Sequence, residues 1–230
     1  MLQQTDLEYL YNARRLSMME IARALGTTHA TVLYWMKRHG IIRRSWSESA
    51  YVKQNKKGDP FAIPTPLTQR QHELLLAALF LYWGEGSKAP GTLRIANLDH
   101  RVLQLFVTFL REVCHVQEER LSVYVRLYEG FDLHAARRYW ANLLGLQERQ
   151  VLTYPHRDSR SHPSKQWSHD GVATLEFHNT KIKRWLDDAL DAWIKKLLAG
   201  ADEVRDGGAT YRAAPRCWEA VSRTERGFFR

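Results

Sequence analysis

Several features that define other protein classes are scarce or missing here. The 230 residues include only two cysteines, Cys114 and Cys217, which argues against a disulfide framework and against a cysteine-rich zinc site. No apolar run reaches the length of about eighteen residues that spans a bilayer, and residues 1–6 lack the basic and apolar regions of a signal peptide. We therefore expect a protein that is located inside the cell and has no membrane partner.

Acidic residues are outnumbered, and nucleotide-binding motifs are missing. The chain carries 34 Lys and Arg against 25 Asp and Glu, a formal net charge of +9 at pH 7. Residues 1–60 alone hold ten basic and five acidic side chains. This excess favours polyanionic partners, because each Lys or Arg that pairs with a phosphate releases condensed counterions. No glycine-rich phosphate loop, nucleophile elbow or dinucleotide fingerprint occurs.

Two short helices joined by a glycine turn are predicted within residues 17–41. Ser17 and Glu20 form a capping box, in which the hydroxyl caps a helix start and the acid reaches back to the open backbone N–H. Gly26 supplies the turn, Thr27 is expected to cap the second helix over 28–38, and Gly40 ends it. An earlier helix with leucines on one side would complete a three-helix core.

The stretch from Ser17 to Ile41 resembles the homeodomain-like helix-turn-helix of resolvases, transposases and many small regulators. The resemblance lies in E-I-A-x-x-L-G from Glu20 to Gly26, followed by T-V-x-x-W from Thr31 to Trp35. It implies that the second helix enters the major groove of double-stranded DNA and that basic residues after it contact phosphates. The residues predicted to meet base edges are Thr28, His29, Thr31 and Tyr34, and those predicted to meet phosphates are Lys37, Arg38, Arg43 and Arg44.

A second module is predicted after a polar, basic linker that contains Pro64 and Pro66. Thr68 and Gln71 form another capping box, and the helix that follows is apolar nearly all round, so we expect it to be buried on most sides. It ends at Glu85, between two glycines that would let backbone or a ligand approach. A carboxylate at the end of a buried helix is costly unless it binds something.

This helix resembles the signature helix of the LAGLIDADG family, which comprises homing endonucleases and non-cutting regulatory relatives. The resemblance places Glu85 on the catalytic, metal-binding acid and Gly86 on the final glycine. It also implies a homodimer through the 69–84 helix, with Mg²⁺ as the cofactor if the protein cleaves DNA. Two positions depart from the family pattern: Trp83 replaces the first acid, and Phe80 replaces the small residue where two such helices cross.

The remaining periodicity predicts helices and strands in the order α-β-α-β-α-β-β-α, with one helix around residues 132–145 more than the simplest family pattern. The expected fold class is α+β, with an antiparallel, saddle-like sheet whose open face contacts DNA. The residues predicted to contact DNA there are Arg94, Tyr124 and Arg126, with Thr92 and Tyr128 beside them. The expected domains are a helix-turn-helix at 1–44, a linker at 45–67, a LAGLIDADG-like domain at 68–199 and an irregular tail at 200–230.

The sequence leads to three alternative hypotheses for the function. The first is a sequence-specific, non-cutting DNA-binding protein, cytoplasmic and nucleoid-associated, that acts as a transcription regulator or as an accessory factor of a mobile element or phage. The second is a Mg²⁺-dependent homing-type endonuclease that works as a homodimer through Glu85. The third is a protein-interaction module whose partner is another protein of transcription or recombination. The polar loop 156–169, with its three histidines, has no assigned role.

Overall fold

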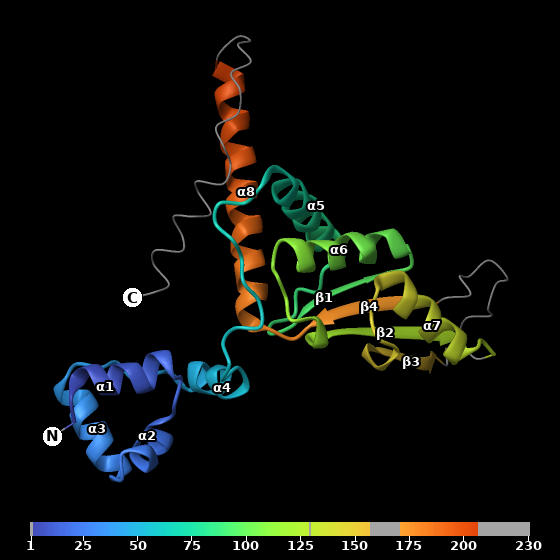
Figure 1. The fold of residues 1–230 in the computed structure, drawn as a ribbon. Coiled ribbons are helices and arrows are strands. Elements are labelled where there is room, and N and C mark those ends of the chain that lie inside the picture. The colour runs from blue at the N-terminus through green and yellow to red at the C-terminus, as the bar shows by residue number, and fades with distance from the viewer. Residues whose placement is uncertain (1, 129, 157–170, 207–230) are drawn as a thin grey trace. The chain divides into compact units, whose positions relative to one another are not determined.

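The structure is a computed structural model, and it describes residues 2–128, 130–156 and 171–206. The chain divides into two compact units, Met1–Pro60 and Phe61–Arg230. Each unit has its own apolar core. We therefore describe the two units one at a time (Figure 1).

The first unit contains three helical segments around a small core, as the sequence predicts. Their bounds are Gln4–Glu8 for α1, continued by a π-helical turn at Tyr9–Ala13, then Met18–Ala24 for α2 and His29–Arg38 for α3. The Ser17–Glu20 capping box is present, and Gly26 turns the chain between α2 and α3 with a φ of +62°. Thr28, rather than the expected Thr27, caps α3. The core consists of Leu7, Tyr11, Ile21, Ala22, Val32, Met36 and Ile41.

A fourth helix, α4 (Trp46–Gln54), lies where the sequence predicts an irregular linker. It begins with a capping box of Ser45 and Glu48 that the sequence analysis missed. No residue of α4 is buried, so apolar periodicity gave no signal for it. Two ion pairs hold the segment that follows α4 against the earlier part of the same unit. One joins Lys56 to Glu20, and the other, of 3.0 Å, joins Asp59 to Arg15.

The second unit is an α+β fold with the predicted order of elements. Its helices are α5 (Gln69–Glu85), α6 (His100–Glu112), α7 (Leu133–Leu144) and α8 (Thr180–Asp206). Its strands are β1 (Leu93–Asn97), β2 (Leu121–Tyr128), β3 (Val151–His156) and β4 (Val172–Phe177). Short 3₁₀ turns at Glu118–Arg120 and Glu148–Gln150 precede β2 and β3. The helix α8 runs past residue 200, where the irregular tail was expected to begin, and residues 207–230 lie outside the described residues.

The four strands form one sheet in the order β1-β4-β2-β3, and it is mixed rather than antiparallel as expected. β4 pairs antiparallel with β1 and with β2, whereas β2 and β3 pair parallel. The reason is α7, the helix that the simplest pattern lacks. It carries the chain back across the sheet, so that β3 starts again at the same end as β2.

Helices α5, α6 and α7 lie over one face of this sheet (Figure 1). The strand residues that point to these helices are almost fully buried, for example Val123, Val125 and Leu175. The alternate residues form the opposite face, called here the open face of the sheet, and most of them are partly or fully exposed. Among the described residues, no helix has the length and apolar content needed to cross a bilayer.

Candidate nucleic-acid interface

The helix α3 presents a polar, basic stripe on the side opposite its buried residues. Val32 and Met36 are completely buried, whereas Tyr34 is 56% exposed and Lys37 and Arg38 are exposed one turn further on. The spacing of three to four residues places these three side chains on one face of the helix. An Arg38 terminal nitrogen donates to the Tyr34 hydroxyl at 3.3 Å, so the stripe combines a ring with two cations.

The start of α3 carries the other residues predicted to meet base edges. The Thr28 hydroxyl accepts a hydrogen bond from the Thr31 N–H at 3.2 Å and lies 2.9 Å from the Thr31 hydroxyl. The two threonine side chains are therefore hydrogen-bonded to each other, and Thr28 also caps the helix. His29 is the first residue of the helix and is partly exposed. Thr28, Thr31 and Tyr34 together with the two cations form a continuous polar surface along α3.

Arg43 and Arg44, both predicted to contact phosphate, have different surroundings. Arg43 is exposed. The Arg44 guanidinium donates to the carbonyl oxygens of Leu16 and Tyr11, and its carbon lies 3.9 Å from the centre of the Tyr11 ring. Burial lowers the pKa of Arg44, although an arginine so perturbed still keeps its charge. Arg44 therefore joins the segment after α3 to the first half of the unit.

Two large apolar side chains beside Arg43 were not singled out from the sequence. Ile42 is 87% exposed and Trp46 is 94% exposed, and both belong to the segment that follows α3. The sequence signal that could have found them is the basic pair Arg43-Arg44 with apolar residues on both sides, Ile42 and Trp46.

The predicted residues of the sheet are brought together on its open face. Arg94, on β1, forms an ion pair of 2.5 Å with Glu176, which is 6% exposed and also lies 3.1 Å from a ring nitrogen of His178. Thr92 precedes β1, and its hydroxyl lies 3.1 Å from the other His178 ring nitrogen. Arg94 thus belongs to a network around a buried carboxylate.

Tyr124 and Arg126 follow each other along the open face of β2. The ring of Tyr124 stacks against that of Tyr154 on β3, with the ring centres 6.2 Å apart and the planes 12° from parallel. Arg126 is exposed and lies directly opposite Tyr154 in the register of β2 and β3. Tyr154 was not among the residues predicted to contact DNA.

Glu85 is the last residue of α5, and its side chain is exposed to solvent. The carboxylate is exposed, so it does not carry the burial cost expected from the sequence. The Lys88 ammonium donates to the carbonyls of Tyr82 and Trp83 at 3.0 Å each and so caps the same helix end. One carboxylate offers a divalent cation a single ligand, and the described residues contain no group of three His, Cys, Asp or Glu side chains that could hold a metal. Within the described residues, Glu85 therefore has no partner ligands for a Mg²⁺ site, and we derive no cleavage step through it.

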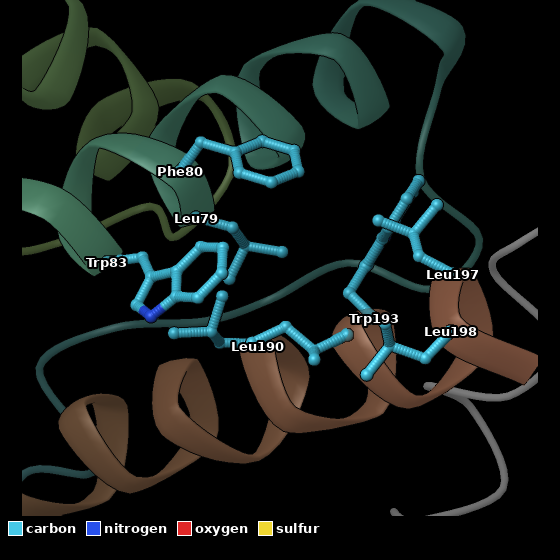
Figure 2. Close-up of a pocket in the computed structure, with 8 residues that line it drawn as sticks. Leu79, Phe80, Trp83, Leu190, Trp193, Leu197 and Leu198 are labelled. Carbon is cyan, nitrogen blue, oxygen red and sulfur yellow. The ribbon is translucent and has the colours of Figure 1, made fainter.

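The helix α5 is buried or half-buried on most sides, as expected, but one face of it remains open. Phe80 and Trp83 are 47% and 51% exposed and line an apolar groove between α5 and α8 (Figure 2). The volume of the groove is about 110 Å³. Its other lining residues are Leu79, Leu190, Trp193, Ile194, Leu197 and Leu198.

Comparison with known proteins gives no relative for this chain. No protein-family model matches it, and neither a curated protein nor a solved structure shows a significant match. The polar loop 156–169 falls, apart from its first residue, outside the described residues, as does Cys217. The other cysteine, Cys114, is a buried free thiol.

Proposed function

We propose that this protein binds double-stranded DNA in a sequence-specific manner without cutting it, and acts as a transcription regulator or as an accessory factor of a mobile element or phage. The observation that carries the proposal is the stripe of Tyr34, Lys37 and Arg38 on α3, opposite the buried Val32 and Met36. A short helix with a polar, basic face and a capped start, held by two other helices, suits the major groove. The net charge of +9 supports a polyanionic partner.

The decisive experiment incubates the full chain with Mg²⁺ or Mn²⁺ and a randomised duplex library, and sequences both the retained and the cleaved molecules. We expect one motif to be retained without cleavage. Cleavage at a fixed site that disappears in Glu85→Gln would replace our proposal by the endonuclease. Retention without any sequence preference would contradict the specific binding that we propose.

Substitutions on the open face of the sheet distinguish our proposal from the alternative that the protein is a protein-interaction module. Our proposal extends the DNA footprint from α3 to Arg94, Tyr124 and Arg126 on the sheet. Arg126→Gln is expected to weaken duplex binding, because an exposed cation is lost. Unchanged duplex affinity in this variant would exclude Arg126 from the duplex footprint and leave the open face for a partner other than duplex DNA.

The residues on α3 give the sharpest test of sequence choice. Tyr34→Ala and Thr31→Ala should each relax the preferred motif by about 1–3 kcal/mol per lost base contact. The measurement is the affinity of each variant for the selected motif and for single-base changes in it. Tyr34→Phe is the matched control, because it keeps the ring and loses only the hydroxyl that pairs with Arg38. If Tyr34→Ala keeps the full preference, α3 does not read the bases through this side chain.

A further inference from the structure

The open face of the sheet carries a flat, aromatic surface next to its edge. We call Tyr124, Arg126 and Tyr154 the tyrosine platform. Tyr124 and Arg126 are alternate residues of β2, so they point to the same side of the sheet, and Tyr154 lies opposite Arg126 on β3. The two rings are nearly parallel, with centres 6.2 Å apart. The β3 strand is the last in the sheet, so the platform is accessible from the edge.

The platform is exposed although its rings are large. Tyr154 is 48% exposed, and its neighbour Leu152 on the same face of β3 is 37% exposed. Each ring of a stacked pair turns one face to its partner, which leaves the outer face of the exposed Tyr154 ring for another planar group. The remaining residues of β2 on the opposite side, such as Val125, are completely buried and fix the strand.

The charge beside the rings is positive and is not neutralised within the described residues. No carboxylate among them pairs with the exposed Arg126 guanidinium. Arg94 on the same face differs, because Glu176 holds it in an ion pair. A planar cation that lies on the same face as two aromatic rings, directly opposite Tyr154 in the strand register, is suited to an anionic ligand that also presents flat groups.

Unpaired nucleotides combine these two properties. In a duplex the base faces are covered by their neighbours, and a protein reaches only base edges, sugars and phosphates. In a single strand the base faces are open and stack on protein aromatic rings, while cations hold the phosphates. We propose that the tyrosine platform binds unpaired bases of a single-stranded nucleic acid, with a base stacked on Tyr154 and Arg126 at the backbone. Single-strand binding at this site does not depend on duplex binding by α3, but the site shares Tyr124 and Arg126 with the duplex footprint proposed above, so a duplex and a single strand would compete for the open face.

The test measures binding of fluorescent oligonucleotides to the full chain by anisotropy at low salt. The probes are a twelve-residue oligothymidylate, the corresponding oligouridylate, and a DNA strand of equal length in which the bases are replaced by abasic sites. We expect Tyr154→Leu to lose about fivefold or more in affinity for the strands with bases, because stacking on one ring contributes about 1–3 kcal/mol per base. Tyr154→Phe keeps the ring and should bind like the unaltered protein.

The controls separate stacking from simple charge attraction and from the duplex site. The abasic strand should bind weakly and should not distinguish Tyr154→Leu from the unaltered protein. A Tyr34→Ala variant should retain single-strand binding even if duplex selection fails. Tighter binding of the thymidylate identifies DNA as the source of the bases, and tighter binding of the uridylate identifies RNA. Equal binding of the abasic strand, or a normally folded Tyr154→Leu that binds every probe unchanged, would overturn the proposal and leave the rings as a cross-strand contact.

Discussion

Arg43 and Arg44 are neighbours in the chain, but their surroundings differ, because Arg43 is exposed and Arg44 contacts the Leu16 and Tyr11 carbonyls. Arg43→Ala should reduce the salt dependence of duplex binding, because one phosphate contact fewer releases fewer counterions. Arg44→Ala should instead destabilise the first unit by about 1.5–3 kcal/mol, since hydrogen bonds from its charged group to the Leu16 and Tyr11 carbonyls are lost. The slope of binding against salt and the free energy of unfolding in urea measure the two effects. An unchanged slope in Arg43→Ala would show that this side chain does not touch phosphate.

Glu20 makes the stability of α2 depend on pH. Hydrogen bonds from Lys56 and from Ser17 lower the pKa of Glu20 from 4.5 to about 2. A carboxylate whose folded pKa is depressed stabilises the folded state above its unfolded pKa, and this contribution is lost as the pH falls from about 4.5 towards 2. Amide-exchange protection in residues 17–25 should therefore decrease over this range.

The matched variant for this effect is Glu20→Gln. Glutamine can complete the capping box but carries no charge, so the protection of α2 in this variant should vary much less between pH 4.5 and 2. Equal pH dependence in both proteins would assign the titration to another group.

At the scale of the element, the end of α5 shows why Gly86 follows Glu85. A Cβ on Gly86 would lie 2.2 Å from the Tyr82 ring and 2.3 Å from the Tyr82 carbonyl oxygen. Tyr82 cannot move aside easily, because its hydroxyl donates to Asp187 at 2.7 Å and accepts from the buried Lys183. The close approach expected from the flanking glycines is therefore made by the protein's own ring.

Gly86→Ala is expected to destabilise the second unit by about 1–3 kcal/mol, the usual cost of inserting a methyl group into a packed site. Gly84→Ala is the control on the same helix, because a Cβ at Gly84 meets nothing within 4 Å and alanine favours a helix. Urea unfolding monitored by circular dichroism compares the two variants. Equal stability of the two would mean that Tyr82 can rearrange at little cost.

The sequence predicted elements well where apolar periodicity and caps coincide. The Ser17 and Thr68 capping boxes and the alternation along β2 located α2, α5 and the central strand correctly. The sequence did not predict α4, because no residue of this helix is buried. It also did not predict the parallel pairing of β2 and β3, because that pairing depends on the path of α7. The alternation along the strands predicted that Arg94, Tyr124 and Arg126 share one face of the sheet, whereas partners distant in sequence, such as Glu176 for Arg94, depend on the strand register.

At the scale of the whole molecule, the apolar groove of α5 and α8 bears on self-association. We propose that two copies pair through the exposed face of α5, since Phe80 and Trp83 leave apolar surface in water. Trp83→Glu should shift sedimentation equilibrium from dimer towards monomer. Trp46→Glu, which alters an exposed tryptophan of the first unit, should leave the association state unchanged. A purely monomeric unaltered protein across the concentration range would refute this pairing.

The order of strands in the sheet also governs how the chain can be assembled during synthesis. Of the strands in the described residues, β4 is synthesised last, yet it is an inner strand, and Leu93 pairs with Phe177, 84 positions later in the chain. Until the ribosome has released β4, β1 has no strand partner and β2 is paired on one side among these residues. The first unit has all its core residues within the first 41 positions. The first unit can therefore fold early, whereas the apolar strands of the second unit wait longer for burial, so we expect the nascent second unit to need chaperones more than the first.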